Sequence, residues 1–222
     1  MQIQSLNRAE AFRYMGYKGG EINETLLKIT EQCEQELLKA INPRYIYKMF
    51  NIEQNNECVK LSDTTLTLKG KDITAHLKDC DRCILLCATL SSGVDKLIRT
   101  HETEGMEKAV ITDSLASAAV EQVCEAAEAE IQNVYPDNFY TWRFSPGYGD
   151  FPLEIQGEFL DALSAPKRIG VTVTDSLILI PRKSVTAVIG VSSREIPKGR
   201  RGCGTCNMKD TCTYRKNYSH CG

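Results

Sequence analysis

The stretch Arg143-Phe144-Ser145-Pro146-Gly147-Tyr148-Gly149-Asp150-Phe151-Pro152 lies between the longest helical pattern of the chain and its last strand patterns. Arg143 offers a planar fork of donors that suits a carboxylate, and Tyr148 offers an aromatic face and a hydroxyl. Gly147 and Gly149 let the backbone come close to a ligand, while Pro146 stiffens the approach because its φ is fixed. The stretch therefore predicts a rigid binding loop. The alternative is a tight turn between a helix and a strand that carries an incidental arginine.

The patterns on either side of this loop predict an α+β fold. Apolar residues at steps of three and four mark helices over residues 22–41 and about 104–134, and six alanines between positions 116 and 129 favour the second helix. Strand patterns cover residues 61–68, 83–90, 169–174 and 185–191. We expect a mixed or antiparallel sheet built from these four segments and covered by the two helices.

Shorter elements fill the remaining chain. We expect a strand at 45–52, a helix from Asp72 as cap to residue 77, and helices at 93–101 and 153–163. A β-ribbon is expected across 177–181, and a short segment with a turn at 12–20. The domain organisation follows: an N-terminal helical segment (1–60) packs on a core (61–193), and a tail (194–222) ends the chain.

The tail differs in composition from the rest. From Arg194 onward seven Lys or Arg stand against two acidic residues, a net charge of +5, which leaves −7 for residues 1–193 within the total of −2. The tail also holds four cysteines, Cys203, Cys206, Cys212 and Cys221. We predict that this short Cys-rich appendage binds one metal centre, either a zinc ion or an iron–sulfur cluster. A redox disulfide pair and idle thiols are the alternatives.

The sequence has no apolar N-terminal segment and no run of the roughly 18 apolar residues that a membrane span needs. We therefore expect a cytoplasmic protein with no membrane partner and with reduced thiols. Cys33 lies on the apolar face of its helix, and Cys80-Asp81-Arg82-Cys83 leads into an apolar run. Core packing is therefore the first interpretation of these thiols, ahead of a metal role for Cys80 and Cys83.

Two motifs resemble those of a known family. Arg143-x-x-x-Gly147-Tyr148 resembles the Arg-x-x-x-Gly-Tyr signature of the S-adenosylmethionine-binding activation domain of cobalamin-dependent methionine synthase. Val173-Thr174-Asp175-Ser176, followed by Pro181 and Ser184, resembles that family's Thr-Glu-Ser turn and Pro-x-x-Ser motif. The resemblance covers about residues 61–191 and is to free-standing versions of the domain. Residues 149–152 depart from the family pattern, and an N-terminal acidic contact of the fused domain has no match.

The resemblance implies a function. The chain would bind S-adenosylmethionine and support reductive methylation, that is reactivation, of cobalamin supplied by methionine synthase modules, with an electron-donating reductase or flavodoxin-like protein as second partner. Such an accessory component needs no general base, and the chain has neither a Gly-x-Gly-x-x-Gly fingerprint after a strand nor a P-loop.

The resemblance also implies roles for individual residues of this chain. Arg143 would pair with the methionine carboxylate, and Tyr148 would lie beside the sulfonium. The remaining implied residues are the backbone contacts Pro146, Gly147 and Gly149, the acidic helix residue Glu121, and Asp175 and Ser176 on the face that meets cobalamin.

Two other functions stay open. The protein that the chain reactivates can be another corrinoid methyltransferase. Alternatively, the chain can be a metal-binding interaction module whose basic tail binds a partner. Nucleic acid is an unlikely partner, because the tail interleaves only Tyr214 and Tyr218 with its cations and the body is acidic.

Overall fold

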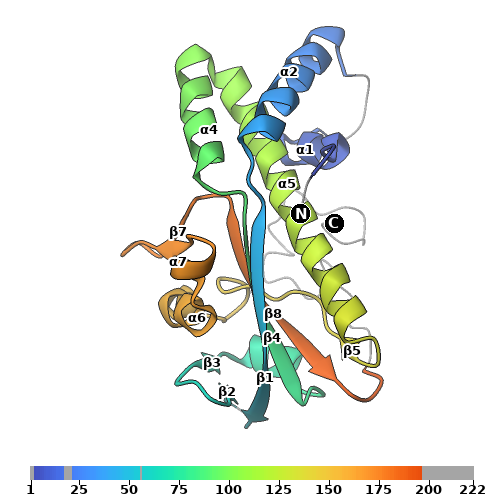
Figure 1. Cartoon of the computed structure of the whole chain (residues 1–222), viewed down its shortest axis with the longest axis vertical. Helices are drawn as coiled ribbons and strands as arrows, with labels where there is room; N and C mark the ends of the chain where they lie inside the picture. Colours follow the sequence, from blue (N-terminus) through green and yellow to red (C-terminus); the bar gives the residue numbers. More distant parts are fainter. Residues whose placement is uncertain (1–2, 18–21, 56, 197–222) are drawn as a thin grey trace. The chain divides into compact units, whose positions relative to one another are not determined.

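The computed structural model of the chain describes residues 3–17, 22–55 and 57–196. Its fold is α+β, as predicted, with a six-stranded sheet in the order β3-β2-β1-β4-β8-β5 (Figure 1). The strands of this sheet are β1 (Arg44–Gln54), β2 (Cys58–Leu61), β3 (Thr67–Lys69), β4 (Arg82–Thr89), β5 (Phe139–Tyr140) and β8 (Ser184–Ser192).

Neighbouring strands of the sheet run antiparallel. Strand β1 pairs antiparallel with β2, β2 with β3, and β5 with β8. At the centre, the Asn42 N–H donates to the Leu90 carbonyl and the Ile52 N–H donates to the Asp81 carbonyl, so the start of β1 meets the end of β4. The expectation of a mixed or antiparallel sheet thus resolves to the antiparallel form.

The chain forms two compact units. Unit 1 contains the residues up to Ile46, Cys87–Val134 and Leu163–Val185, and unit 2 contains Tyr47–Leu86, Tyr135–Ala162 and the described residues from Thr186 onward. Strands β1, β4 and β8 contribute residues to both units. The division of the chain at residues 60 and 193 stays a prediction.

Unit 1 is built on the alanine-rich helix α5 (Met106–Val134), against which α1 (Arg8–Tyr14), α2 (Glu24–Ala40) and α4 (Ser92–Glu104) pack (Figure 1). Small side chains let neighbouring helices approach closely. The core that results joins all four helices to the end of β4; its fully buried members include Ala11, Leu37, Ala88, Leu90, Val94, Leu115 and Ala119. Both predicted long helices are confirmed.

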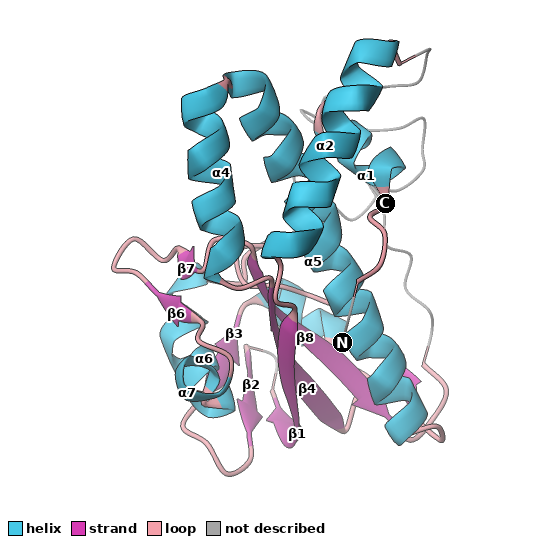
Figure 2. Cartoon of the chain, turned by 45° about the horizontal axis from the view of Figure 1, so that its top comes forward, coloured by secondary structure: helices cyan, strands magenta, loops and turns pink. Residues whose placement is uncertain are grey.

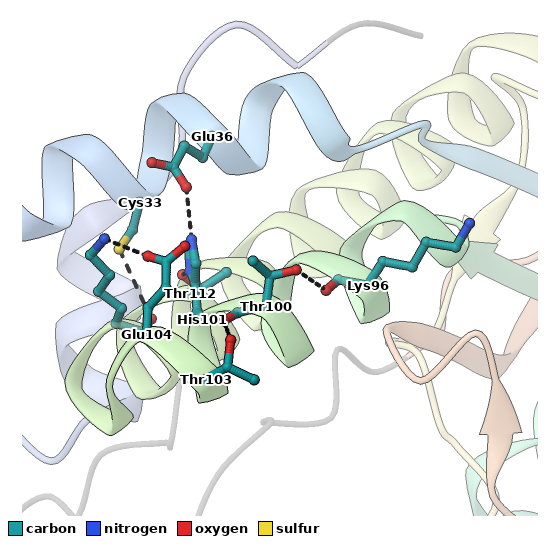
Figure 3. A network of polar contacts seen from close by, with 9 residues as sticks. Cys33, Glu36, Lys96, Thr100, His101, Thr103, Glu104 and Thr112 are labelled. Atoms are coloured by element: carbon teal, nitrogen blue, oxygen red, sulfur yellow. Dashed lines mark hydrogen bonds and ion pairs between the residues drawn. The ribbon is translucent and has the colours of Figure 1, made fainter.

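A polar network centred on the buried His101 joins α2, α4 and α5 within unit 1 (Figure 3). The His101 Nδ1 lies 2.7 Å from Thr112 Oγ1, and its Nε2 lies 2.7 Å from Glu36 Oε2. This order of carboxylate, imidazole and hydroxyl occurs in nucleophilic enzymes, but Thr112 is fully buried inside a helix, where no substrate reaches its hydroxyl. The network therefore fastens three helices together.

Unit 2 contains α3 (Lys71–His76), a 3₁₀ turn η1 (Leu153–Ile155) and most of α6 (Gln156–Leu163). Its buried residues come from these elements, from the strands and from the segments that connect them; they include Phe50, Val59, Leu68, Ile73, Leu77, Leu85, Phe151, Phe159 and Val188. The Thr186 hydroxyl donates to Gln156 Oε1 at 2.9 Å, so the start of α6 is also held by a buried hydrogen bond.

The sheet differs from the prediction in two places. The predicted strand 61–68 is two short strands, β2 and β3, because Asp63 adopts φ 59° and the Leu66 N–H donates to Thr64 Oγ1, which closes a turn between them. The segment 169–174 does not join the large sheet. Only Thr172–Val173 is extended (β6), and it pairs with β7 (Leu179–Ile180) in a separate two-stranded ribbon (Figure 2).

The second difference goes with a turn in the chain. Helix α7 (Ala165–Arg168) precedes β6, and the chain then reverses through residues 174–178, which we call the β6–β7 turn. Leu177 has φ 62° in this turn. Strand β6 pairs antiparallel with the residues that follow the turn. A ribbon is present, as predicted, but its strands are Thr172–Val173 and Leu179–Ile180 instead of a ribbon across 177–181.

One helix was not predicted, and one predicted cap is wrong. For residues 12–20 we expected a short segment and a turn; α1 covers Arg8–Tyr14, a turn follows at Met15 and Gly16, and residues 18–20 lie outside the described residues. Asn7 caps α1, and its side chain accepts from the Glu10 N–H. Asp72 does not cap α3, since the N-cap position is Gly70, which offers no side chain. The capping group comes from elsewhere in the chain, as the site geometry shows.

The cysteines expected in the core are there. Cys33 is 1% exposed, Cys80 8% and Cys83 0%, so core packing is confirmed for them. Burial raises the pKa of the Cys80 thiol to about 12 and raises the pKa of Cys83 further. Thiols that stay protonated near neutral pH are weak nucleophiles. In the part of the chain that the structure describes, no helix has both the length and the apolar character needed to cross a membrane.

Candidate functional site

The binding loop, residues 143–152, connects β5 to η1 in unit 2 and is tied to the sheet at its start. Phe144 and Val188 of β8 exchange two backbone hydrogen bonds of 2.9 and 2.8 Å. Arg143 is half-buried directly before this pairing. The position of its Cα is therefore set by the sheet rather than by the loop that follows.

The loop then folds back on itself. The Gly147 N–H donates to the Phe151 carbonyl at 2.8 Å, and the Phe151 N–H donates to the Tyr148 carbonyl at 3.0 Å. Gly147 (φ 92°) and Gly149 (φ 57°) both adopt left-handed backbone conformations that side-chain-bearing residues rarely take. Pro146 is buried and Phe151 is 1% exposed, so both anchor the loop in the core. The Tyr148 ring is 67% exposed at its tip.

A carboxylate fixes the far end of the loop. Asp150 accepts hydrogen bonds from the backbone N–H groups of Lys71 (2.7 Å) and Asp72 (2.9 Å) at the start of α3. In return, the Asp150 N–H donates to Asp72 Oδ2 at 3.2 Å. Asp150 thus supplies the cap that Gly70 cannot provide, across 78 residues of sequence.

The loop brings together five of the predicted site residues, Arg143, Pro146, Gly147, Tyr148 and Gly149. It presents the half-buried Arg143 at its start and the exposed ring of Tyr148 at its tip. A guanidinium of restricted mobility binds a carboxylate with less loss of side-chain entropy than a fully exposed one. The predicted roles of these residues toward a ligand remain predictions.

The other predicted residues lie in unit 1. Asp175 and Ser176 are exposed in the β6–β7 turn, where Ser176 Oγ lies 2.9 Å from Thr174 Oγ1. Ser184 Oγ of the second motif lies 2.6 Å from the carbonyl oxygen of Pro181 and 2.8 Å from Thr89 Oγ1, and these contacts fix the end of the ribbon. Both motifs therefore form ordered structures within their own units.

Glu121, the last of the predicted site residues, lies on α5, and its charge acts on Tyr14 at the end of α1. Burial, followed by the negative charges of Glu121 and Glu10, raises the pKa of Tyr14 to about 12. Tyr14 is 38% exposed and carries the Arg13 guanidinium 4.7 Å above its ring. The role of Glu121 toward a ligand also stays a prediction.

Sequence reasoning missed several residues that hold the loop in place: Asp72, His76, Thr141, Trp142 and Asp150. Three of them belong to the loop or adjoin it, but their partners lie more than sixty residues away along the chain. The glycines at 147 and 149 were the available signal that the loop backbone lies close to a ligand or to another part of the protein. In fact Gly149 faces Asp72 rather than open space.

One further feature of unit 2 lies apart from the loop residues. A surface hollow of about 290 Å³ in unit 2 is lined by Glu53, Lys60, Leu61, Ser62 and residues 64–67, none of which was predicted as a site residue. The four tail cysteines Cys203, Cys206, Cys212 and Cys221 lie outside the described residues. Among residues 3–17, 22–55 and 57–196, no group of three or more His, Cys, Asp or Glu is arranged to hold a metal ion.

Comparison with known proteins places the fold. No protein-family model matches the chain, and no curated protein sequence matches it. Among solved structures, that of the MetH reactivation domain bound to AdoHcy is similar to the structure of this chain, with a TM-score of 0.68. The similarity covers 88% of this chain and 77% of that one, at 14% sequence identity. The chain therefore shares a fold with that domain.

Proposed function

We propose that the chain binds S-adenosylmethionine at the binding loop and supports reductive methylation of the cobalamin of methionine synthase. The observation that carries this proposal is the shared fold with a reactivation domain whose structure contains AdoHcy, over 88% of this chain. The Arg-x-x-x-Gly-Tyr motif adds support, since its residues form one fastened loop rather than an extended linker.

The loop suits the methionine end of this ligand. The Arg143 guanidinium would pair with the carboxylate through two parallel hydrogen bonds, and the Tyr148 ring would lie beside the positively charged sulfur. The N–H groups of Gly147, Tyr148, Asp150 and Phe151 already donate to acceptors within the protein. We therefore expect the loop backbone to offer mainly carbonyl oxygens, which accept from the ligand's amino group.

The chemistry asks little of the protein beyond positioning. A reductase delivers one electron to oxidised cobalamin, and the reduced cobalt then takes the methyl group from the sulfonium. The carbon–sulfur electron pair stays on sulfur, so the second product is S-adenosylhomocysteine. Side chains that hold the sulfonium with its methyl group outward supply the required alignment, and no proton needs to move.

The partners follow from this role. Methionine synthase modules that carry cobalamin would dock on the chain, with Asp175 and Ser176 on the face that meets them, and Glu121 would contribute an acidic contact to the ligand. The ligand-binding core would be residues 61–193, to which the segment 1–60 and the tail are appended. Pull-down from the native cell extract, followed by detection of corrinoid, separates methionine synthase from another corrinoid methyltransferase as the client.

Direct titration tests the central claim. Isothermal calorimetry with S-adenosylmethionine and with S-adenosylhomocysteine should give saturable binding at one site per chain. The matched control ligands are methionine and adenosine, each of which supplies half of the contacts. A chain that binds neither sulfonium nor thioether ligand would refute the proposed function.

The tail carries a proposal of its own. Cys203, Cys206, Cys212 and Cys221 would bind one zinc ion or one iron–sulfur cluster, because four thiolates complete a tetrahedral site. Anaerobic purification followed by metal analysis and a visible spectrum distinguishes the two. A protein without stoichiometric metal, with all four thiols titratable, would leave Cys203 and Cys206 as a redox pair instead.

A further inference from the structure

The six-residue helix α3 is held at both ends by the segment that contains the binding loop. Its first two N–H groups, those of Lys71 and Asp72, donate to the two carboxylate oxygens of Asp150. Its last residue, His76, places Nε2 2.9 Å from the Trp142 carbonyl oxygen and 2.7 Å from Thr141 Oγ1. Residues 141–150 and α3 therefore contact each other at two points.

The approach at the first point depends on two glycines. A Cβ at Gly149 would lie 2.0 Å from Asp72 Oδ2, and a Cβ at Gly70 would lie 2.7 Å from Asp150 Oδ1 and 2.9 Å from its carbonyl oxygen. Real Cβ atoms do not come this close to oxygen. Loop and helix thus meet at a spacing that side chains at these positions would prevent.

The charge on Asp150 contributes to this contact. Hydrogen bonds from the backbone of Asp72 and then of Lys71 lower the pKa of Asp150 below its ordinary value of 3.8, with a smaller contribution from the positive charge of Lys71. The carboxylate is therefore ionised at neutral pH and faces the positive end of the helix. An ionised cap holds two N–H donors at once, which a neutral hydroxyl does not.

Aromatic contacts connect the second point, at His76, with Tyr148 at the tip of the loop. The His76 ring meets Trp142 edge-on, with centroids 4.7 Å apart, and lies 5.0 Å from the Phe144 ring. Phe144 in turn lies 6.4 Å from Tyr148 and 6.1 Å from the buried Phe151. Arg143 sits between Trp142 and Phe144 in the chain, so both of its neighbours belong to this ring cluster.

We propose that α3 is the clamp that sets the geometry of the binding loop, with Asp150 and His76 as positioning residues for Arg143 and Tyr148. This inference rests on the proposed function, because it names the groups that hold the proposed ligand contacts in place. Asp150 fixes the Tyr148–Gly149 end of the loop, and His76 fixes the end that carries Arg143. Neither residue needs to touch the ligand.

The test measures coupling between the clamp and the two residues that it positions, with S-adenosylhomocysteine as the calorimetric probe. Asp150→Ala should weaken binding about tenfold in the otherwise unchanged chain, as expected for loss of a charged cap. In a Tyr148→Ala background the same change should weaken binding less than about twofold, because the group that Asp150 positions is gone. His76→Ala should behave in the same way toward an Arg143→Ala background, and His76→Gln, which keeps a donor for the Trp142 carbonyl, should restore most of the affinity.

Further measurements separate positioning from simple destabilisation. Asp150→Asn keeps an acceptor for one of the two helix N–H groups and should give an intermediate loss of affinity with little change in melting temperature. Amide exchange at Lys71 and Asp72 should quicken in Asp150→Ala. Asp161→Ala, an exposed carboxylate on α6 in the same unit, is the control and should change neither property.

Three outcomes overturn the proposal in different ways. A parent chain that binds no S-adenosylhomocysteine refutes the proposed function and this inference with it. A parent that binds, together with an Asp150→Ala variant of unchanged affinity, refutes only the clamp. Equal losses from Asp150→Ala with and without Tyr148 would show that Asp150 acts on stability in general and not through the tyrosine.

Discussion

The binding loop and the β6–β7 turn each carry one of the two predicted motifs, but they are held in different ways. The loop has hydrogen bonds of its own but is also fixed by bonds to Val188, Lys71 and Asp72, which lie between 44 and 79 residues away in sequence. In the turn, the Leu177 N–H donates to the Thr174 carbonyl and the Ile178 N–H donates to Thr174 Oγ1, so these contacts close within five residues.

This difference separates two kinds of motif. A turn closed by its own residues has a conformation that local chemistry specifies, and changes elsewhere in the chain leave it intact. A loop closed by distant groups has a conformation that depends on the whole unit, and it can therefore hold a ligand contact such as Arg143 in a fixed place. Changes in the binding loop should therefore affect stability and ligand affinity strongly, and changes in the β6–β7 turn should affect them little.

The largest effect should come from Gly149→Ala. The added Cβ would collide with Asp72 Oδ2 and would place alanine at φ 57°. Together, the backbone strain and the lost Asp72 hydrogen bond should lower the free energy of unfolding by about 3 kcal/mol. Gly170→Ala is the matched control, since Gly170 has φ 74° with nothing within 4 Å of the added Cβ, and it should cost only about 1 kcal/mol. Equal melting temperatures for the two variants would contradict the close approach of loop and helix.

Arg143→Ala should have the next largest effect, on ligand affinity rather than stability. Loss of an ionic hydrogen-bond partner from a partly desolvated carboxylate should weaken S-adenosylmethionine binding by about 2 kcal/mol, or about thirtyfold. Calorimetry measures this directly. The control is Arg194→Ala, an exposed arginine of the same unit, which should bind as the parent does. An Arg143→Ala variant with parental affinity would show that the loop is not the ligand site.

Tyr148→Phe should be milder, because the ring survives and only the hydroxyl is lost. We expect affinity to fall by about threefold or less. The rate of methyl transfer to reduced cobalamin should fall more than the affinity if the hydroxyl helps to align the sulfonium. Single-turnover methylation with saturating S-adenosylmethionine measures the rate; an unchanged rate would leave Tyr148 with a packing role alone.

The smallest effect should come from Thr174→Ala in the β6–β7 turn. The change removes the acceptor of the Ile178 N–H, a hydrogen bond near the surface, and should cost about 0.5 kcal/mol of stability. Affinity for S-adenosylmethionine should stay at the parental value. Thermal denaturation and calorimetry check the two statements, with Thr65→Ala, an exposed threonine in another turn, as control. A large loss of affinity would mean that the turn and the loop are not independent.

The sequence by itself determined the elements whose causes are local. The spacing of apolar residues and the alanines of 116–129 specify α2 and α5, because helix formation depends on neighbours three and four positions away. The continuous apolar run at 83–90 specifies the buried strand β4, and the two glycines flanking Tyr148 mark the loop. The two motifs, in their order along the chain, predicted the fold of the activation domain. The similarity to the structure of the MetH reactivation domain agrees with this prediction.

Only the tertiary structure decided what the extended segments pair with and what holds the loop. Strand pairing and capping satisfy backbone groups with partners from any part of the chain, so local pattern cannot identify them. For this reason residues 169–174 formed a ribbon instead of joining the sheet, and Asp150 rather than Asp72 became the cap of α3. The carboxylate that caps the helix and the glycines that admit it lie on segments that meet only when unit 2 has folded.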